Sequence, residues 1–134
     1  MKIAYIKRYK FSLICIILIW ILCLMPVPEV EIAEDVPFID KWTHIVMYLG
    51  TCMIMWLEYL NAHPEGICWK RLVIGAILSP ILMSGLLELL QAYCTGGRRS
   101  GDWMDLAANT VGVALAAILG YLFSGQYLKG KRKS

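Results

Sequence analysis

Four long apolar segments dominate this chain and restrict what it can fold into. Each is close to the 17–25 residues that a helix needs to cross the hydrocarbon core of a bilayer. Charged residues are only 17% of the 134-residue sequence and gather between these segments, whereas soluble proteins carry roughly 25%. The pattern predicts an all-α membrane protein, folded as a single domain over residues 1–134. The predicted transmembrane helices cover residues 11–27, 42–60, 72–93 and 105–123.

The distribution of lysine and arginine predicts how these helices are oriented. Ten of the thirteen basic residues fall before the first segment, in the connection 61–71 or in the C-terminal tail. The other three, Lys41, Arg98 and Arg99, lie in the remaining two connections. Because basic residues concentrate on the cytoplasmic side, both termini are expected in the cytoplasm. The net charge of +3 then reflects topology, and no nucleic-acid partner is expected.

The first apolar segment has a second interpretation as a signal peptide, since basic residues precede it. The sequence that follows, Met25-Pro26-Val27-Pro28, is a poor cleavage site, so an uncleaved helix is expected. In the third segment Pro80 predicts a kink, because proline cannot donate the helical hydrogen bond. The five cysteines form no disulfide or C-x-x-C pattern and are expected to pack as apolar residues.

The fourth segment carries a small residue at every fourth position. Small residues at this spacing lie on one helix face and let two helix backbones approach closely. Packing against another helix of the same chain is favoured over homodimerisation, and the sequence does not predict an oligomeric state. The residues are Ala108, Gly112, Ala116, Gly120 and Ser124.

Polar residues fall at one depth on three of the predicted helices. In the predicted topology the second and fourth helices begin on the outer side, and the third ends there. At 1.5 Å per residue the polar positions lie within about 10 Å of the outer boundary, and spacings of three or four residues keep each pair on one helix face. They are His44 and Tyr48, Glu88 and Gln91, and Asp105 and Asn109, with Arg99 in the loop between the third and fourth helices.

Two interpretations of these residues stay open. In the structural one, Asp105 caps the fourth helix, Gln91 and Asn109 hydrogen-bond across helices, and Glu88 pairs with Arg99. In the functional one, the same residues line a binding or catalytic pocket that opens outward. The common depth favours the pocket, because ionisable groups inside a membrane are costly and usually functional.

The residues around such a pocket indicate what it would hold. Lys41, Arg98 and Arg99 lie next to two outward-pointing helix N-termini, and both features attract phosphate or carboxylate groups. His44 and Glu88 are the side chains suited to general acid–base chemistry. No zinc-binding signature is present, so neither a metal nor a cofactor is expected.

Two blocks of residues at these positions match the pattern of a known family. They are Asp40, Lys41, His44 and Tyr48 in the first block, and Glu88, Gln91, Arg99, Asp105, Asn109 and Gly112 in the second. In these blocks the chain resembles the VanZ-like family of small bacterial membrane proteins, over residues 40–120. It lacks the proline often found in the loop between the third and fourth helices of that family.

The resemblance implies a multi-pass protein of the bacterial cytoplasmic membrane. The family takes its name from a protein associated with low-level teicoplanin resistance that works without the usual rebuilding of cell-wall precursors. One hypothesis is therefore an accessory protein whose outward pocket binds a lipid-linked or cell-wall ligand, in addition to membrane lipid. The alternatives are an enzyme that uses Glu88, His44 and Asp105 on an anionic envelope substrate, and a structural scaffold of four helices.

Overall fold

The computed structural model describes residues 2–25, 39–94 and 103–133, and every element within these ranges is helical. The predicted all-α class is therefore confirmed. The elements are α1 (Lys2–Arg8), α2 (Lys10–Leu24), α3 (Ile39–Ala62), α4 (Trp69–Val73), a π-helical stretch η2 (Ile74–Leu78), α5 (Ser79–Cys94) and α6 (Trp103–Lys133).

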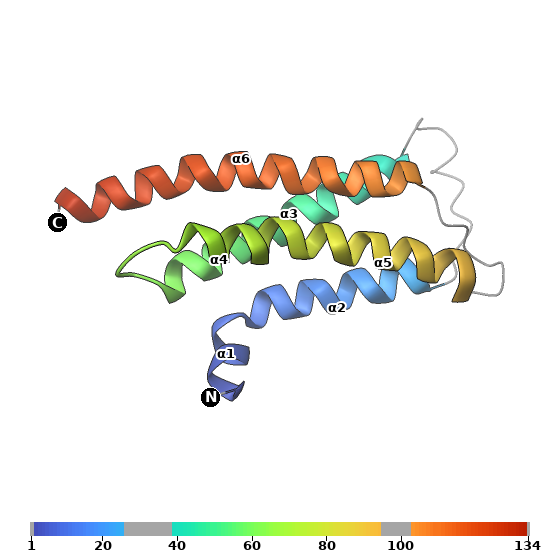
Figure 1. Ribbon diagram of the computed structural model, residues 1–134, viewed down its shortest axis with the longest axis horizontal. Helices are drawn as coiled ribbons and strands as arrows, with labels where there is room; N and C mark the ends of the chain where they lie inside the picture. Colours follow the sequence, from blue (N-terminus) through green and yellow to red (C-terminus); the bar gives the residue numbers. More distant parts are fainter. Residues whose placement is uncertain (1, 26–38, 95–102, 134) are drawn as a thin grey trace.

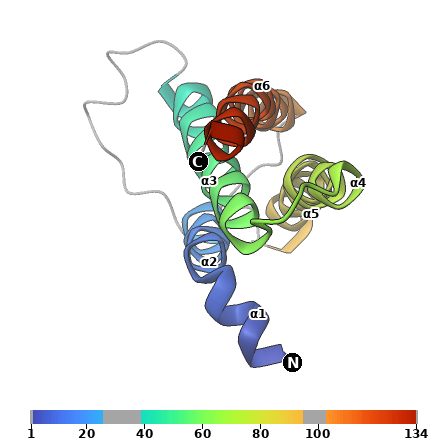
Figure 2. The ribbon, with the colours of Figure 1, turned by 90° about the vertical axis from the view of Figure 1, so that its left-hand side faces the viewer.

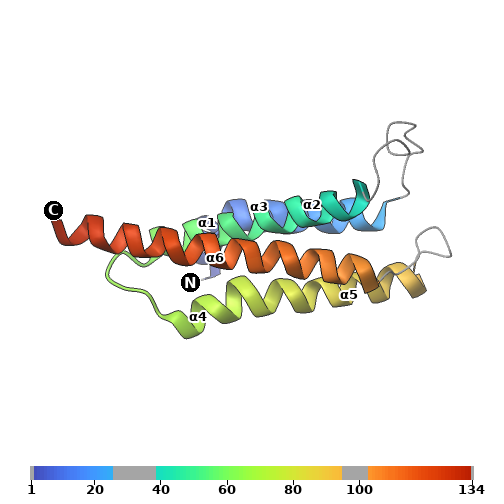
Figure 3. The ribbon, with the colours of Figure 1, turned by 90° about the horizontal axis from the view of Figure 1, so that it is seen from above.

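The helix α2, the helix α3, the continuous segment from α4 to α5, and α6 lie side by side and alternate in direction along the chain (Figure 1). α3 packs between α2 and α6, and α5 contacts both α6 and α2, so the helices close a ring that is visible end-on in Figure 2. Figure 3 shows both chain termini toward the same end. We call this the termini end, and it also holds the connection 63–68. The opposite end, where α2 and α5 finish and α3 and α6 begin, holds a network of polar side chains that includes Lys41 and Asp105. We call it the network end.

Three of the helices are long and apolar enough to cross a membrane: Lys41–Ala62, Trp69–Cys94 and Trp103–Gly130. The shorter α2 is also apolar. Large hydrophobic side chains on their outer faces are exposed, among them Leu18, Leu82 and Ile118. Exposed apolar surface of this extent is unusual for a protein surrounded by water, and it agrees with a multi-pass membrane protein.

The predicted boundaries differ from the observed helix ends by between one and ten residues, and two of these differences have clear physical reasons. The first predicted transmembrane helix corresponds to α2, which ends at Leu24 and not at residue 27, because Met25 is extended, with φ −69° and ψ 149°. A residue that precedes a proline is disfavoured in the helical conformation. The last helix continues to Lys133, ten residues beyond the predicted boundary. Hydropathy marks where a segment leaves the apolar core, whereas helical hydrogen bonds continue through polar residues.

The small residues of α6 pack directly against α3. A Cβ atom on Gly112 would lie 2.6 Å from the carbonyl oxygen of Ile45, and one on Gly120 would collide with the indole ring of Trp56. Ala116 between them is fully buried. The predicted packing between helices of the same chain is confirmed at these positions.

A widened turn precedes the proline of the third predicted span. Pro80 has no N–H to donate, and the five residues Ile74–Leu78 before Ser79 are π-helical. The Ser79 N–H bonds the carbonyl oxygen of Ile74, five residues back, and its hydroxyl donates to the same oxygen at 2.9 Å. The turn before the proline is thus irregular, and the kink expected at Pro80 stays a prediction.

Side chains of the neighbouring helices hold both ends of α2. At its start, the Glu58 carboxylate of α3 accepts the N–H groups of Phe11 and Ser12 at 2.9 and 3.0 Å, and the Ser12 hydroxyl. At its end, Gln91 Nε2 of α5 donates to the carbonyl oxygen of Cys23 at 2.8 Å. Terminal N–H and C=O groups have no partner inside their own helix, so these bonds fix where α2 begins and ends against its neighbours.

Candidate functional site

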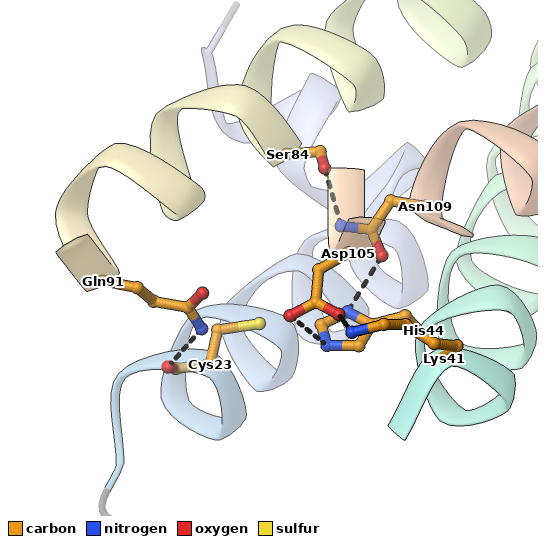
Figure 4. A network of polar contacts seen from close by, with 7 residues as sticks. All are labelled: Cys23, Lys41, His44, Ser84, Gln91, Asp105 and Asn109. Carbon is orange, nitrogen blue, oxygen red and sulfur yellow. Dashed lines mark hydrogen bonds and ion pairs between the residues drawn. The ribbon is translucent and has the colours of Figure 1, made fainter. Parts of the chain in front are cut away.

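Five polar side chains from α3, α5 and α6 form a continuous network at the network end (Figure 4). Lys41 Nζ forms an ion pair with Asp105 Oδ1. The other carboxylate oxygen of Asp105 lies 3.7 Å from His44 Nε2. His44 Nδ1 lies 2.9 Å from Asn109 Oδ1, and Asn109 Nδ2 donates to Ser84 Oγ at 2.6 Å.

Helical spacing and helix direction explain why these side chains meet. Lys41 and His44 lie in the first turns of α3, and Asp105 and Asn109 in the first turns of α6. Separations of three and four residues place each pair on one face. α3 and α6 begin at the same end of the molecule, so the two faces lie at one depth. The close approach of the two backbones at Gly112 lets these short side chains reach each other.

Burial increases steadily along the network. The side chains of Lys41 and Asp105 are 18% and 14% exposed, whereas Asn109 is 2% exposed and Ser84 is fully buried. The network therefore leads from a charged pair near the surface to neutral polar groups in the interior.

Tyr48 and Glu88 lie at the inner end of this network. Tyr48 is fully buried and Glu88 is 5% exposed. Glu88 and Ser84 are among the groups that interact electrostatically with the Tyr48 phenol. Among the described residues, none is placed to give the Tyr48 hydroxyl a well-formed hydrogen bond. A buried phenol and a buried carboxyl group thus lie next to the Ser84 end of the network.

The structure divides the predicted site residues into three groups. His44, Asp105 and Asn109 are in direct contact, and Lys41 joins them. Tyr48 and Glu88 are buried beside them, with Gly112 at the contact between α3 and α6. Gln91 points toward α2, and Arg98, Arg99 and the side chain of Asp40 lie outside the described residues.

Asp105 does not have the role that the structural interpretation predicts, and Ser84 was not predicted at all. Asp105 lies two residues inside α6, which begins at Trp103, and it pairs with Lys41, so it is not the residue that caps the helix. Ser84 was not predicted, although it lies four residues before Glu88 and seven before Gln91 on the same face of α5. The cross-helix hydrogen bonds of Gln91 and Asn109 are those that the structural interpretation predicts.

The network has the groups needed to bind an anion or move a proton. The amide oxygen of Asn109 faces the His44 ring and accepts a hydrogen bond from Nδ1, so Nδ1 carries a proton in this arrangement. The other ring nitrogen, Nε2, faces Asp105. A histidine held in this way between an amide and a carboxylate has a fixed ring orientation. Among residues 2–25, 39–94 and 103–133, no cluster of three histidine, cysteine or acidic side chains could hold a metal ion.

Comparison with known proteins identifies the family. The searches of curated proteins and of solved structures found no match. The family model described as VanZ/LLP1 matches residues 5–124, a range that contains every residue of the network. Since this match covers most of the sequence, the chain belongs to the VanZ/LLP1 family.

Proposed function

We propose that the protein crosses the bacterial cytoplasmic membrane four times, with α2 as the first crossing and both termini in the cytoplasm. α2 is apolar and runs alongside the three longer helices (Figure 1). An even number of crossings is consistent with termini at the same end. Basic residues gather at that end, as the positive-inside rule requires of a cytoplasmic side. They include Lys7, Arg8, Lys10, Lys70, Arg71 and Lys129.

Two native cysteines provide a test of this topology. Cys94 is exposed at the network end and Cys68 is exposed at the termini end. In intact spheroplasts, a membrane-impermeant maleimide is expected to label Cys94, whereas Cys68 is labelled only after permeabilisation. The variants Cys94→Ser and Cys68→Ser assign each signal in a gel-shift assay. Labelling of Cys68 in intact spheroplasts would show the opposite orientation.

We further propose that the network end is an outward-facing binding site for an anionic lipid-linked or cell-wall ligand, and that the protein acts as an accessory factor in the envelope. The observation that carries this proposal is the partly exposed Lys41–Asp105 pair, which continues into a buried polar network. An anionic group that approaches Lys41 would compete with Asp105. The N-termini of α3 and α6 point toward the same region and favour negative charge there.

An enzymatic function is the second candidate, and one observation favours it. His44 lies between Asp105 and Asn109, with Glu88 buried nearby. Such an arrangement can act as a general acid or base on an anionic envelope substrate. The structural scaffold remains the third candidate, since the network is largely satisfied by internal hydrogen bonds.

Neutral substitutions of the charged pair separate function from stability. Asp105→Asn and Lys41→Gln are each expected to leave folded protein in the membrane while removing activity. The two side chains are only 18% and 14% exposed, so breaking the pair should cost more than the about 0–1 kcal/mol of a surface pair and less than the about 3–5 kcal/mol of a fully buried one. Activity is therefore compared per unit of folded protein. Lys70→Gln, which removes a charge at the other end, is the matched control. Immunoblotting and teicoplanin susceptibility are measured on the same cells.

Glu88→Gln and Arg99→Lys extend this test to the predicted partners of the network. Glu88→Gln replaces a buried ionisable group with an amide of nearly the same shape. Arg99→Lys keeps the charge but loses the planar guanidinium group that binds carboxylate or phosphate in a bidentate manner. Both are expected to abolish activity at near-normal abundance.

Profiling of lipids and cell-wall precursors in these cells separates the three candidates. Altered binding of the drug with unchanged precursors supports the accessory function. A covalently altered lipid or precursor that disappears in the variants supports the enzyme. Activity that falls only in proportion to protein abundance, in every variant, supports the scaffold and contradicts both other candidates.

A further inference from the structure

A second polar region lies at the termini end, far along the helices from the network. A half-open cavity of about 440 Å³ lies there, lined by α1, α2, α3, α4 and η2. This volume is within the range of about 300–1,000 Å³ that is typical of small-molecule sites. α1 bends away from the axis of α2 in this region (Figure 1). The cavity shares no residue with the network and goes beyond the function proposed for it.

The polar part of the cavity is positively charged. Arg8 of α1 and Arg71 of α4 both line it, together with the phenol groups of Tyr5 and Tyr9. Within the described ranges, no carboxylate forms an ion pair with either arginine, and none lines the cavity. The nearest buried acid, Glu58, is already bonded to the first turn of α2. The two arginines therefore have no ion-pair partner among the described residues.

The tyrosines and the histidine at this end are positioned to complete a polar rim. Burial and the neighbouring Tyr59 raise the pKa of Tyr9, so its hydroxyl keeps its proton and can donate a hydrogen bond. His63 stacks on Tyr59 with ring centroids 4.2 Å apart, and its Nδ1 bonds the Tyr59 carbonyl oxygen at 3.0 Å. The Tyr59 hydroxyl is bonded in turn to the backbone of Cys68 at 3.0 Å, which ties the connection 63–68 to the wall of the cavity.

The deeper part of the cavity is apolar. From Ser12 on α2 and from Leu72 on α4, its wall continues for about one more helical turn, or about 5 Å, toward the middle of the helices. The residues that line this part are Leu13, Ile16, Met55, Leu72 and Ala76. A ligand that fills the whole cavity needs an anionic group at one end and a hydrocarbon portion at the other.

Gly75 of η2 lines the cavity and helps to keep it open. No atom lies within 4 Å of the position that a Cβ would occupy there, so the space next to this glycine is not filled by another part of the protein. The residue is within the π-helical stretch before Pro80. Single π-helical turns within α-helices occur frequently at functional sites.

We propose that this cavity binds one anionic phospholipid, with its phosphate at Arg8 and Arg71 and the start of an acyl chain along the apolar wall. Guanidinium groups bind phosphate oxygens through paired, charge-assisted hydrogen bonds. Basic pockets between membrane helices bind anionic headgroups by the same chemistry. A free phosphate ion would satisfy the arginines but leave the apolar half unfilled, whereas a zwitterionic lipid would present a second positive charge to them.

The test uses the full chain, purified in a mild detergent and delipidated. Dioleoylphosphatidylglycerol, dioleoylphosphatidylcholine and inorganic phosphate are titrated separately, and bound lipid is counted by native mass spectrometry. We expect phosphatidylglycerol to bind saturably with one lipid per chain, and phosphatidylcholine to bind at least tenfold more weakly. Phosphate at concentrations far above those of the lipid is expected neither to bind nor to displace it.

Matched variants locate the bound lipid. Arg8→Gln and Arg71→Gln lie on separate helices, and each is expected to weaken phosphatidylglycerol binding about fivefold. Lys70→Gln is the control, because Lys70 adjoins Arg71 in sequence but does not line the cavity. Gly75→Leu fills the cavity without removing charge and should abolish binding, whereas Gly85→Leu, on the same span and with equally open space at its Cβ, should not.

Three results would overturn the proposal. Equal loss of lipid in Lys70→Gln and in the arginine variants would show general attraction to a basic surface. Displacement of the lipid by millimolar phosphate would show a site for small anions. Unchanged binding in Gly75→Leu, with a thermal unfolding temperature like that of the unmodified chain, would place the lipid elsewhere.

Discussion

Gly112→Ala is expected to destabilise the protein by about 1–3 kcal/mol, the usual cost of inserting an atom into a packed interface. The added Cβ would lie 2.6 Å from the Ile45 carbonyl oxygen and 3.1 Å from the Leu49 nitrogen. Both atoms belong to the backbone of α3, so neither can move aside without displacing the helix. The measurement is thermal unfolding of the detergent-solubilised protein, followed by fluorescence-detected size-exclusion chromatography.

Gly125→Ala is the matched control for this substitution. Gly125 lies on the same helix, α6, but nothing lies within 4 Å of its Cβ position. Alanine is a better helix former than glycine by about 1 kcal/mol, so the control should be as stable as the unmodified chain or slightly more stable. Equal unfolding temperatures for Gly112→Ala and Gly125→Ala would show that α3 and α6 are not in backbone contact.

Glu58→Ala is expected to cost about 1.5–3 kcal/mol, the range for hydrogen bonds to a charged group. The change leaves the N–H groups of Phe11 and Ser12 without their acceptor at the start of α2. Local opening should accompany the loss of stability. In hydrogen exchange followed by mass spectrometry, the amides of the first two turns of α2 should exchange faster, while those of α6 are unchanged.

Glu65→Ala controls for the removal of an acid from this end of the molecule, because Glu65 is exposed in the connection between α3 and α4. Its exchange pattern should match that of the unmodified chain. If Glu58→Ala also leaves exchange in α2 unaltered, the carboxylate does not hold the start of that helix.

The sequence predicted the helices and the gathering of polar residues toward one end of them, because both follow from local patterns. Hydropathy identifies an apolar segment, and a spacing of three or four residues identifies a face. The pairing of Lys41 with Asp105 also has complementary charges that can be recognised once the two helices are adjacent. These are interactions between side chains, and each partner leaves a signal in the sequence.

The partners of Glu58 and Gln91 could not be predicted in the same way. Each side chain bonds to backbone atoms of α2, and backbone N–H and C=O groups are present at every residue except proline, which has no N–H. No complementary residue marks Phe11 or Cys23 as the partner. Glu58 lies near the end of the second predicted span, where an acid without a partner would be costly, and the structure shows the groups that bond to it. Ser84 was missed because a small hydroxyl group on an apolar helix is common and can bond its own backbone.

In the proposed topology, where α2 is a membrane crossing, the hydrogen bonds at both of its ends have a consequence for the surrounding membrane. Its 15 residues measure only about 22 Å at 1.5 Å per residue, whereas the hydrocarbon core of a bilayer is about 30 Å thick. A free helix would respond to this hydrophobic mismatch by shifting or by recruiting flanking residues. α2 is bonded to α3 at one end and to α5 at the other, so the lipid has to adapt instead. We expect the bilayer to thin locally along the outer face of α2, which would draw the protein toward thinner regions of the membrane and bring headgroups closer to both ends of that helix.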